Sequence, residues 1–252
     1  MTADAGKTSA SRQAFISGKA AELAGLDLRR RIFAAAGAPP EAYLDRGFRL
    51  QLDRHFVMFR KGGITHRLDL SRLPRDPNGD VLAGEGRFDP PTTALDPNGQ
   101  GAPYATYAFA AQVAQVEVDE ALGTVKVLRI VAAHDVGKAL NPIQVEGQIQ
   151  GGALQGLGLA LMEEYLPGKT ENFHDYLIPT IGDAPAMDCI LVEDPEPLGP
   201  SGAKGVGEPG LIPTAPAILG AIDHATGVRM RQVPVLPHRL KAALDARPGR
   251  RP

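Results

Sequence analysis

The fold is decided by the stretch Gln112-Val113-Ala114-Gln115-Val116-Glu117-Val118-Asp119, then Glu120-Ala121-Leu122-Gly123, then Thr124-Val125-Lys126-Val127-Leu128-Arg129-Ile130-Val131. Val116 and Val118 alternate with polar residues, which is the period-two pattern of a strand with one buried face. A second run rich in β-branched residues follows, and Gly123 stands between the two runs, where a tight turn needs it. The stretch therefore predicts a β-hairpin within residues 112–134.

Further helices and strands are expected on both sides of this hairpin. The helices are expected at residues 8–37, at about 143–165, from Pro213 and Thr214 to near Gly227, and at about 236–246. The strands are expected as short segments within 48–70, around the turn Lys61-Gly62-Gly63, and as one strand near 187–193. This order mixes helices and strands without a regular βαβα rhythm. The predicted fold class is therefore α+β, with mixed helices and short β-sheets, rather than doubly wound α/β.

The outer segments carry more specific signals. Thr8, Ser9 or Ser11 is expected to cap the first helix, and Gly37 before two prolines is expected to end it. Residues 71–104 are polar and rich in Pro and Gly, which indicates a long loop and a possible subdomain boundary within one domain spanning 1–252. Residues 247–252 are expected to form a disordered tail.

Composition excludes several classes of protein. Hydrophobic residues make up 43% of the chain and the net charge is -2, so a globular fold is expected and nucleic-acid binding has no support. Cys189 is the one cysteine, which excludes a disulfide framework and an iron–sulfur cluster held by this chain. No stretch approaches the roughly 18 apolar residues of a membrane span, and the N-terminus lacks a signal-peptide core. The expected compartment is the cytoplasm.

The segment 144–158 is unusual for a helix because it holds five glycines, at 147, 151, 152, 156 and 158. Each interior glycine costs a helix roughly 0.8–1 kcal/mol relative to alanine, so something must offset that cost. Two pairs spaced by four residues leave flat patches that admit another backbone or a planar ligand. Gln144, Gln148 and Gln155 follow one stripe of the same helix, and carboxamides suit a heterocycle such as a pterin. Tight helix packing with solvated glutamines is the alternative.

A second glycine-rich segment, 199–210, carries a single carboxylate, Glu208. Small neighbours allow a loop carboxylate to face a pocket, and in an apolar pocket its pKa would rise toward the range useful for a general base. Two alternatives remain open. Glu208 is also suited to the N-terminus of the helix that starts near 213. Residues 205–210 match G-x-G-x-x-G, but no strand is expected directly before them, as a dinucleotide fingerprint requires.

Other polar combinations are weaker. His134-Asp135 and His174-Asp175 are each expected to make turn or core hydrogen bonds. The six histidines show no H-E-x-x-H pattern and no clustering with cysteine, so no metal ligated by protein side chains is expected. No G-x-S-x-G elbow or Walker A loop is present.

The ordered motifs resemble the C-terminal molybdopterin-binding domain of the xanthine dehydrogenase/aldehyde oxidase family. They are Thr8-Ser9-Ala10-Ser11-Arg12-Gln13, His134-Asp135-Val136-Gly137, Asn141-Pro142, Gly147-Gln148, Gln155-Gly156-Leu157-Gly158, Glu163-Glu164, Tyr176-Leu177-Ile178-Pro179 and Lys204-Gly205-Val206-Gly207-Glu208-Pro209. The resemblance covers nearly the whole chain. Its specificity comes from the combination and the order, since each motif alone is common.

The resemblance implies a role for each of seven residues. Glu208 matches the catalytic general base of the family, and Gln155 matches a glutamine that hydrogen-bonds the pterin. Ala10, Ser11 and Gln13 fall where the family holds the pterin and its phosphate, at a helix start whose free N–H groups suit an anion. Val206 and Gly207 would lie beside the metal centre.

The resemblance also implies an activity and a set of partners. The chain would belong to a molybdenum hydroxylase that hydroxylates an aldehyde or N-heterocycle with oxygen from water, after Glu208 removes a proton at the metal centre. The molybdenum would be held by molybdopterin, in its cytosine dinucleotide form, with no protein side chain as ligand. Two electrons would leave through Fe-S clusters to FAD or another acceptor. The Fe-S clusters and FAD would be carried only by partner subunits, an Fe-S subunit and a FAD subunit.

The family's molybdenum-binding region is much longer than this chain, and the residues that sort substrates lie in its upstream portion. The chain is therefore expected to be a small subunit or a fragment that is inactive without that portion. A non-catalytic assembly subunit, or degenerate fragment that keeps the fold, is the first alternative. A nucleotide-dependent dehydrogenase that uses 205–210 is the second.

Overall fold

The computed structural model describes residues 6–247 of the chain. The chain divides into two compact units, one made of residues 1–15 and 92–252 and the other of residues 16–91. We call them unit 1 and unit 2. The return from unit 2 to unit 1, between Pro91 and Thr92, lies within the segment 71–104.

A three-stranded sheet forms the centre of unit 1, with strands β4 (Ala110–Asp119), β5 (Thr124–Asp135) and β6 (Ala186–Val192) in that order. β4 and β5 are antiparallel, whereas β5 and β6 are parallel, with Arg129 paired to Ala186. Gly123 adopts a φ of +72° at the turn between β4 and β5, a backbone conformation that glycine tolerates best. The predicted hairpin is confirmed.

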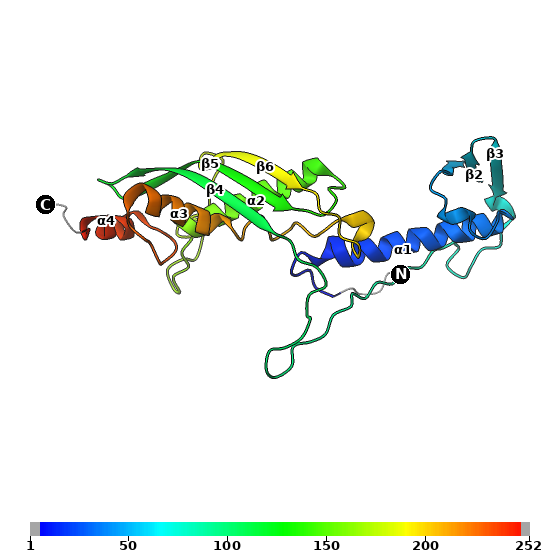
Figure 1. Ribbon diagram of the computed structural model, residues 1–252, viewed down its shortest axis with the longest axis horizontal. Coiled ribbons are helices and arrows are strands. Elements are labelled where there is room, and N and C mark those ends of the chain that lie inside the picture. Colours follow the sequence, from blue (N-terminus) through cyan, green and yellow to red (C-terminus); the bar gives the residue numbers. More distant parts are fainter. Residues whose placement is uncertain (1–5, 248–252) are drawn as a thin grey trace. The chain divides into compact units, whose positions relative to one another are not determined.

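Three helices pack against this sheet and share one core with it (Figure 1). They are α2 (Pro142–Leu161), α3 (Thr214–Thr226) and α4 (Pro237–Asp245). Residues of β4 alternate between exposed and half-buried positions, because one face of the sheet is turned to the helices. The largest fully buried aliphatic side chains of this core are Ile130, Ile149, Ile218, Ile222, Leu240 and Leu244. The α+β fold class follows from this arrangement.

The predicted bounds of α2 are right at the start and wrong at the end. The Asn141 side chain caps the helix by accepting a hydrogen bond from the Gln144 N–H at 3.2 Å, and Pro142 occupies its first turn. The helix ends at Leu161 rather than near 165, because the chain folds back over Gly158. A Cβ atom added at Gly158 would lie 2.0 Å from the Glu163 carboxylate, so the returning chain needs this glycine.

The predicted start of the first helix is also wrong. Helix α1 spans Arg12–Ala35, not 8–37. Ala10 and Ser11 have φ values of +53° and +56°, in the left-handed region, so the chain makes a turn where the helix was expected. The Ser11 hydroxyl does not cap the helix in the expected way, since it accepts a hydrogen bond from the Glu208 N–H. Gly37 follows the helix with a φ of +67°, as predicted.

Unit 2 has a small aromatic core of its own. Strands β1 (Arg49–Asp53), β2 (Phe56–Lys61) and β3 (Ile64–Asp69) form an antiparallel sheet in sequence order, and Gly62 has a left-handed conformation at the second turn. The rings of Phe33 and Phe59 stack with centroids 4.3 Å apart. Two short 3-10 helices, Ala42–Leu44 and Leu70–Arg72, complete this unit. Strands β2 and β3, on either side of Gly62 and Gly63, confirm the short strands expected around this turn.

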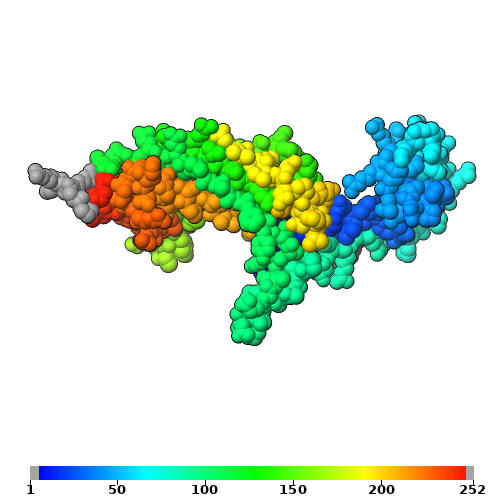
Figure 2. All heavy atoms as spheres, in the orientation of Figure 1, coloured from blue at the N-terminus to red at the C-terminus, as the bar shows by residue number. Residues whose placement is uncertain are grey.

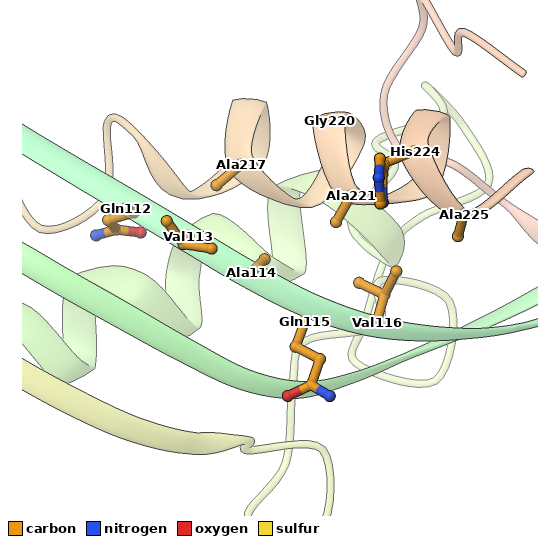
Figure 3. A pocket seen from close by; sticks show the side chains of 10 residues that line it. All are labelled: Gln112, Val113, Ala114, Gln115, Val116, Ala217, Gly220, Ala221, His224 and Ala225. Carbon is orange, nitrogen blue, oxygen red and sulfur yellow. The ribbon is translucent and has the colours of Figure 1, made fainter. Parts of the chain in front are cut away.

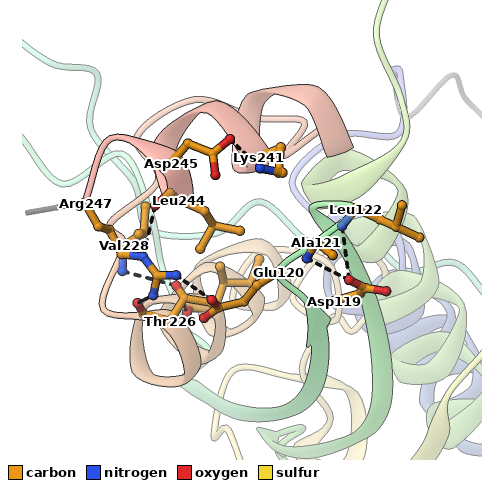
Figure 4. A network of polar contacts seen from close by, with 11 residues as sticks. Asp119, Glu120, Ala121, Leu122, Thr226, Val228, Lys241, Leu244, Asp245 and Arg247 are labelled. Atoms are coloured by element: carbon orange, nitrogen blue, oxygen red, sulfur yellow. Dashed lines mark hydrogen bonds and ion pairs between the residues drawn. The ribbon is translucent and has the colours of Figure 1, made fainter. Parts of the chain in front are cut away.

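Hydrogen bonds fix two peripheral segments of unit 1. The loop between Thr93 and Ala102 is closed by hydrogen bonds in both directions and projects from unit 1 (Figure 2). Arg247 is the first residue of the expected tail, and its guanidinium donates to the Thr226 and Leu244 carbonyls and to the Glu120 carboxylate (Figure 4). The remaining expected tail, 248–252, lies outside the described residues. Among residues 6–247, no helix is long and apolar enough to cross a membrane.

Candidate functional site

A cavity of about 370 Å³ lies within unit 1. Three segments form it, namely the turn before α1, the first two turns of α2 with the residues before it, and the loop that carries Glu208. Its lining is formed by Thr8, Ser11, Gln13, Ala14, Val136, Lys138, Leu140, Asn141, Gln144, Val145, Gln148, Ala203, Lys204, Val206 and Gly207. Segments from both ends of the sequence therefore meet at one cavity.

The lining contains no carboxylate and two lysines. Lys138 is half exposed and pairs with Glu193 at 2.7 Å, whereas Lys204 is buried and pairs with Asp135 at 2.6 Å. The carboxamides of Gln144 and the nearby Gln148 are exposed and add donors and acceptors without charge. Together with the apolar side chains, this composition suits a ligand that has an anionic part and a polar ring.

The turn at Ala10 and Ser11 holds the Glu208 loop closely. Two successive non-glycine residues in the left-handed region are costly, and such strain persists where its surroundings demand it. The Ser11 hydroxyl accepts a hydrogen bond of 2.7 Å from the Glu208 N–H. A Cβ atom at Gly205 would lie 2.0 Å from the Ser11 carbonyl oxygen, so only glycine fits there. The turn at Ala10 and Ser11 and the Glu208 loop therefore pack closely against each other.

Glu208 lies at the tip of that loop, next to the cavity-lining Gly207. Its side chain is exposed and makes no ion pair or hydrogen bond within the described part of the chain. Its carbonyl oxygen accepts from the Leu211 N–H at 3.0 Å, which starts the series of turns leading to α3. The carboxylate is therefore free to act on a molecule outside the chain, while the backbone beneath it is fixed.

Buried polar groups support both ends of this loop. Asp135 pairs with Lys204, and the adjacent His134 faces Gln112, with 3.1 Å between Nε2 of each side chain. Burial lowers the pKa of His134, which favours the neutral imidazole. Gln112 also donates to the Gly210 carbonyl at 3.0 Å. Core hydrogen bonding of His134 and Asp135 was expected, and it is confirmed.

His174 and Asp175 were the other expected pair. The His174 N–H donates to the Asn172 side chain at 2.8 Å and the Asp175 N–H donates to the Asn172 carbonyl at 3.1 Å. This is an exposed turn, as expected, and it lies apart from the cavity.

The structure brings together most of the predicted cofactor-binding residues. Ser11, Gln13, Val206 and Gly207 line the cavity, and Ala10 adjoins it in the strained turn. Gln155 is exposed on α2, two turns beyond Gln148, and is not part of the lining. The stripe of glutamines therefore reaches the cavity at its first two members, Gln144 and Gln148.

The glycine pairs of α2 have different surroundings. A Cβ atom at Gly152 would lie 2.8 Å from the Gly210 backbone, and one at Gly156 would lie 2.4 Å from the Thr214 Cβ. Gly147 and Gly151 have nothing within 4 Å. The patch at Gly152 and Gly156 therefore packs against the end of the Glu208 loop, as the alternative of tight packing predicts. The patch at Gly147 and Gly151 is open.

Three polar residues that hold the ends of the Glu208 loop were not predicted from the sequence to do so. Gln112, Lys204 and Thr214 are polar residues within otherwise apolar or glycine-rich segments, and that is the one local signal they carry. Their partners lie far away in the chain. Lys204 and Asp135 are 69 positions apart, and Thr214 and Gln112 are 102 positions apart. Spacing along one element cannot reveal such pairs.

A second hollow, of about 440 Å³, lies between β4 and α3 (Figure 3). Its α3 side is formed by Ala217, Gly220, Ala221, His224 and Ala225. His224 is its one ionisable group and the rest are small or apolar side chains and two glutamines, so it offers little for chemistry. Elsewhere in residues 6–247, no three His, Cys, Asp or Glu side chains gather where they could hold a metal ion.

Comparison with known families identifies the chain. The sequence pattern of the molybdopterin cofactor-binding domain matches residues 1–185. The chain belongs to this family. This molybdopterin cofactor-binding domain is the kind found in xanthine dehydrogenases and aldehyde oxidoreductases, as its relatives indicate.

The molybdopterin cofactor-binding domain is similar to several curated proteins. It is 40% identical over 139 residues to the xanthine dehydrogenase molybdenum-binding subunit of Escherichia coli O157:H7, which covers 53% of this chain and 18% of that protein. It is 31% identical over 217 residues to the aldehyde oxidoreductase molybdenum-binding subunit PaoC of Escherichia coli K12, covering 83% of this chain and 27% of that protein. The chain thus spans about a fifth to a quarter of these relatives.

Two solved structures agree with the family. The aldehyde oxidoreductase from Desulfovibrio gigas superposes with a TM-score of 0.75 at 28% identity, covering 96% of this chain and 24% of that one. Quinoline 2-oxidoreductase from Pseudomonas putida 86 superposes with a TM-score of 0.67 at 26% identity, covering 96% and 31%. The α+β fold of the molybdopterin cofactor-binding domain is therefore that of the molybdenum-binding parts of these enzymes.

Proposed function

We propose that this chain is the cofactor-binding part of a molybdenum hydroxylase, which hydroxylates an aldehyde or an N-heterocycle with oxygen from water. The observation that carries the proposal is the cavity of unit 1, which has the acidic loop tip at Glu208 beside it. The assembled enzyme would be completed by the upstream portion of the molybdenum subunit and by Fe-S and FAD subunits, and it would work in the cytoplasm.

The residues present fit molybdopterin. Its phosphate needs N–H and cationic groups, which the start of α1 and the Lys138 ammonium group would supply. Its pterin ring needs paired donors and acceptors, which the exposed Gln144 and Gln148 carboxamides would supply. Gly207 would let the ligand approach the loop backbone closely. Ala10, Ser11, Gln13, Gln155 and Val206 complete the proposed cofactor-binding set, and the dinucleotide form is proposed to be the cytosine one.

Glu208 would act as the general base. When bound, the molybdenum cofactor would supply a two-electron acceptor and would organise the water-derived oxygen. The Glu208 carboxylate would accept the proton that is released as this oxygen is transferred to an electron-poor carbon. The two electrons would then leave toward the Fe-S clusters and FAD of the partner subunits.

The test is the substitution Glu208→Gln in the assembled enzyme, which keeps the size of the side chain and removes the base. Turnover should fall by about 100-fold to 10,000-fold, the usual contribution of a positioned base. Molybdenum and pterin content should stay unchanged. Glu171→Gln is the control, since Glu171 is exposed and apart from the cavity. Full turnover by Glu208→Gln would overturn the proposed role, and an enzyme without pterin would overturn the cofactor assignment.

A further inference from the structure

Two neighbouring buried residues at the end of β5 support opposite ends of the loop 204–210. His134 has 1% of its surface exposed and Asp135 has 8%. Neither contacts the cavity as a lining residue, and neither has a role in the proposed function. Asp135 pairs with Lys204 at the beginning of the loop, and His134 contacts Gln112, which binds Gly210 at its end. Glu208 lies between these two supports.

The first support is an ion pair at the beginning of the loop. Asp135 Oδ2 accepts from Lys204 Nζ at 2.6 Å, and Asp135 Oδ1 accepts from the Gly137 N–H at 3.1 Å. The Lys204 N–H donates to the Val136 carbonyl at 3.1 Å, so backbone and side chain are both held. Because Asp135 and Lys204 side chains are 8% and 7% exposed, water competes little for this pair.

The second support is a hydrogen-bond chain at the end of the loop. Gln112 Nε2 has two hydrogens, and it donates one to the Gly210 carbonyl and one to His134 Nε2. Its Oε1 atom accepts from the Thr214 hydroxyl at 2.7 Å, and that hydroxyl also lies 3.1 Å from the Gly210 carbonyl. All the hydrogen-bonding atoms of the Gln112 amide are therefore used. This arrangement requires a neutral His134 that accepts at Nε2.

We propose that Asp135, through Lys204, and His134, through Gln112, are positioning residues that fix the Glu208 carboxylate. The proposal rests on the role of Glu208 proposed above. Glu208 itself is exposed and has no side-chain partner within residues 6–247, so its position depends on its backbone. A base that is misplaced by about 1 Å loses much of its effect, and rigid supports at both ends of a short loop prevent this.

The test compares Gln112→Met with Gln115→Met in the assembled enzyme. Both glutamines lie on β4 (Figure 3), but Gln115 is exposed, whereas Gln112 hydrogen-bonds to His134 and to the Gly210 carbonyl. We expect Gln112→Met to speed hydrogen exchange of the amides in 204–210 by about tenfold and to lower kcat by about tenfold. KM should change less than twofold and cofactor content should not change. Gln115→Met should behave as the unaltered enzyme.

The ion pair is tested by Asp135→Asn, with the same readouts and the same expected direction. If the lone buried Lys204 charge prevents folding, the double variant Asp135→Leu with Lys204→Met removes both charges together. Unchanged exchange or unchanged kcat in the folded variants would overturn the positioning role. Exchange is read without catalysis, so it tests the supports even if Glu208→Gln proves fully active, which would overturn the proposed function alone.

Discussion

His134 is the residue whose chemistry depends most on its surroundings. It is fully buried, its Nε2 atom faces an N–H donor, and its Nδ1 atom is buried without a partner among the described residues. Both conditions disfavour the imidazolium form, because a positive charge there would be unsolvated and would confront a donor. The burial therefore makes the stability of unit 1 depend on pH.

We expect the free energy of unfolding to fall as the pH is lowered below about 6.5. Burial holds the pKa of His134 below its ordinary value of 6.5, so the unfolded chain takes up a proton that the folded chain refuses. The stabilising contribution is fully present above pH 6.5 and is lost as the pH falls toward the folded pKa. Urea denaturation should give a slope of at most about 1.4 kcal/mol per pH unit from this group.

The control separates this effect from that of other histidines. His134→Gln should reduce the slope between pH 5 and 6.5, whereas His174→Gln should leave it unchanged, because His174 is exposed. An identical slope in all three proteins would contradict the assignment to His134.

Residues with a local signal were the ones that the sequence could reveal. Glu208 stood alone among glycines, and Ser11 stood in a small-residue turn, so both were singled out and both lie at or beside the cavity. Lys204 was quoted as part of a motif, but its burial against Asp135 was not foreseen. Burial and pairing across 69 positions depend on the tertiary fold, which no window of sequence contains.

At the scale of elements, α2 is the clearest case of a helix shaped by what it packs against. The spacing of its glycines predicted two flat patches, and this was correct. The spacing could not show which patch another segment would cover, because this depends on the path of the loop before α3. The structure places the Gly210 backbone over Gly152 and Thr214 over Gly156. The predicted start of α1 and the predicted end of α2 were wrong because of contacts that helical spacing does not show. Ser11 before α1 binds the distant Glu208 N–H, and the chain after α2 folds back over Gly158.

This difference predicts opposite effects for two alanine substitutions in one helix. Gly156→Ala should destabilise the chain by about 1–3 kcal/mol, because the new Cβ would lie 2.4 Å from the Thr214 Cβ. Gly147→Ala should stabilise it by about 0.5–1 kcal/mol, since nothing lies within 4 Å and alanine favours the helix. Chemical denaturation of the two variants measures both, and equal effects of the same sign would contradict the packing described for α2.

At the scale of the whole molecule, the chain has two separate cores. The core of unit 1 joins β5 with α2, α3 and α4, whereas that of unit 2 is built around Phe33, Phe48 and Phe59. The sequence indicated the strands of both units, but the size of each core depends on long-range packing. Stability is therefore expected to be distributed between two cooperative regions.

Phe59→Ala should remove about 3–5 kcal/mol of stability from unit 2, because Phe59 is fully buried and stacks on Phe33. Hydrogen exchange of the β1–β3 amides should become faster, and that of the β4–β6 amides should stay the same. Faster exchange in both sheets would mean that the two cores unfold as one.

The hydrogen bond between Ser11 and Glu208 joins residues 197 positions apart. Unit 1 is discontinuous in the sequence, and its first segment leaves the ribosome long before its sheet is made, whereas unit 2 is one continuous segment that can fold first. Closing so long a loop is slow and takes place only after most of the chain exists. A nascent chain stalled before residue 208 should therefore present a folded unit 2 but lack the cavity at which we propose that the cofactor binds.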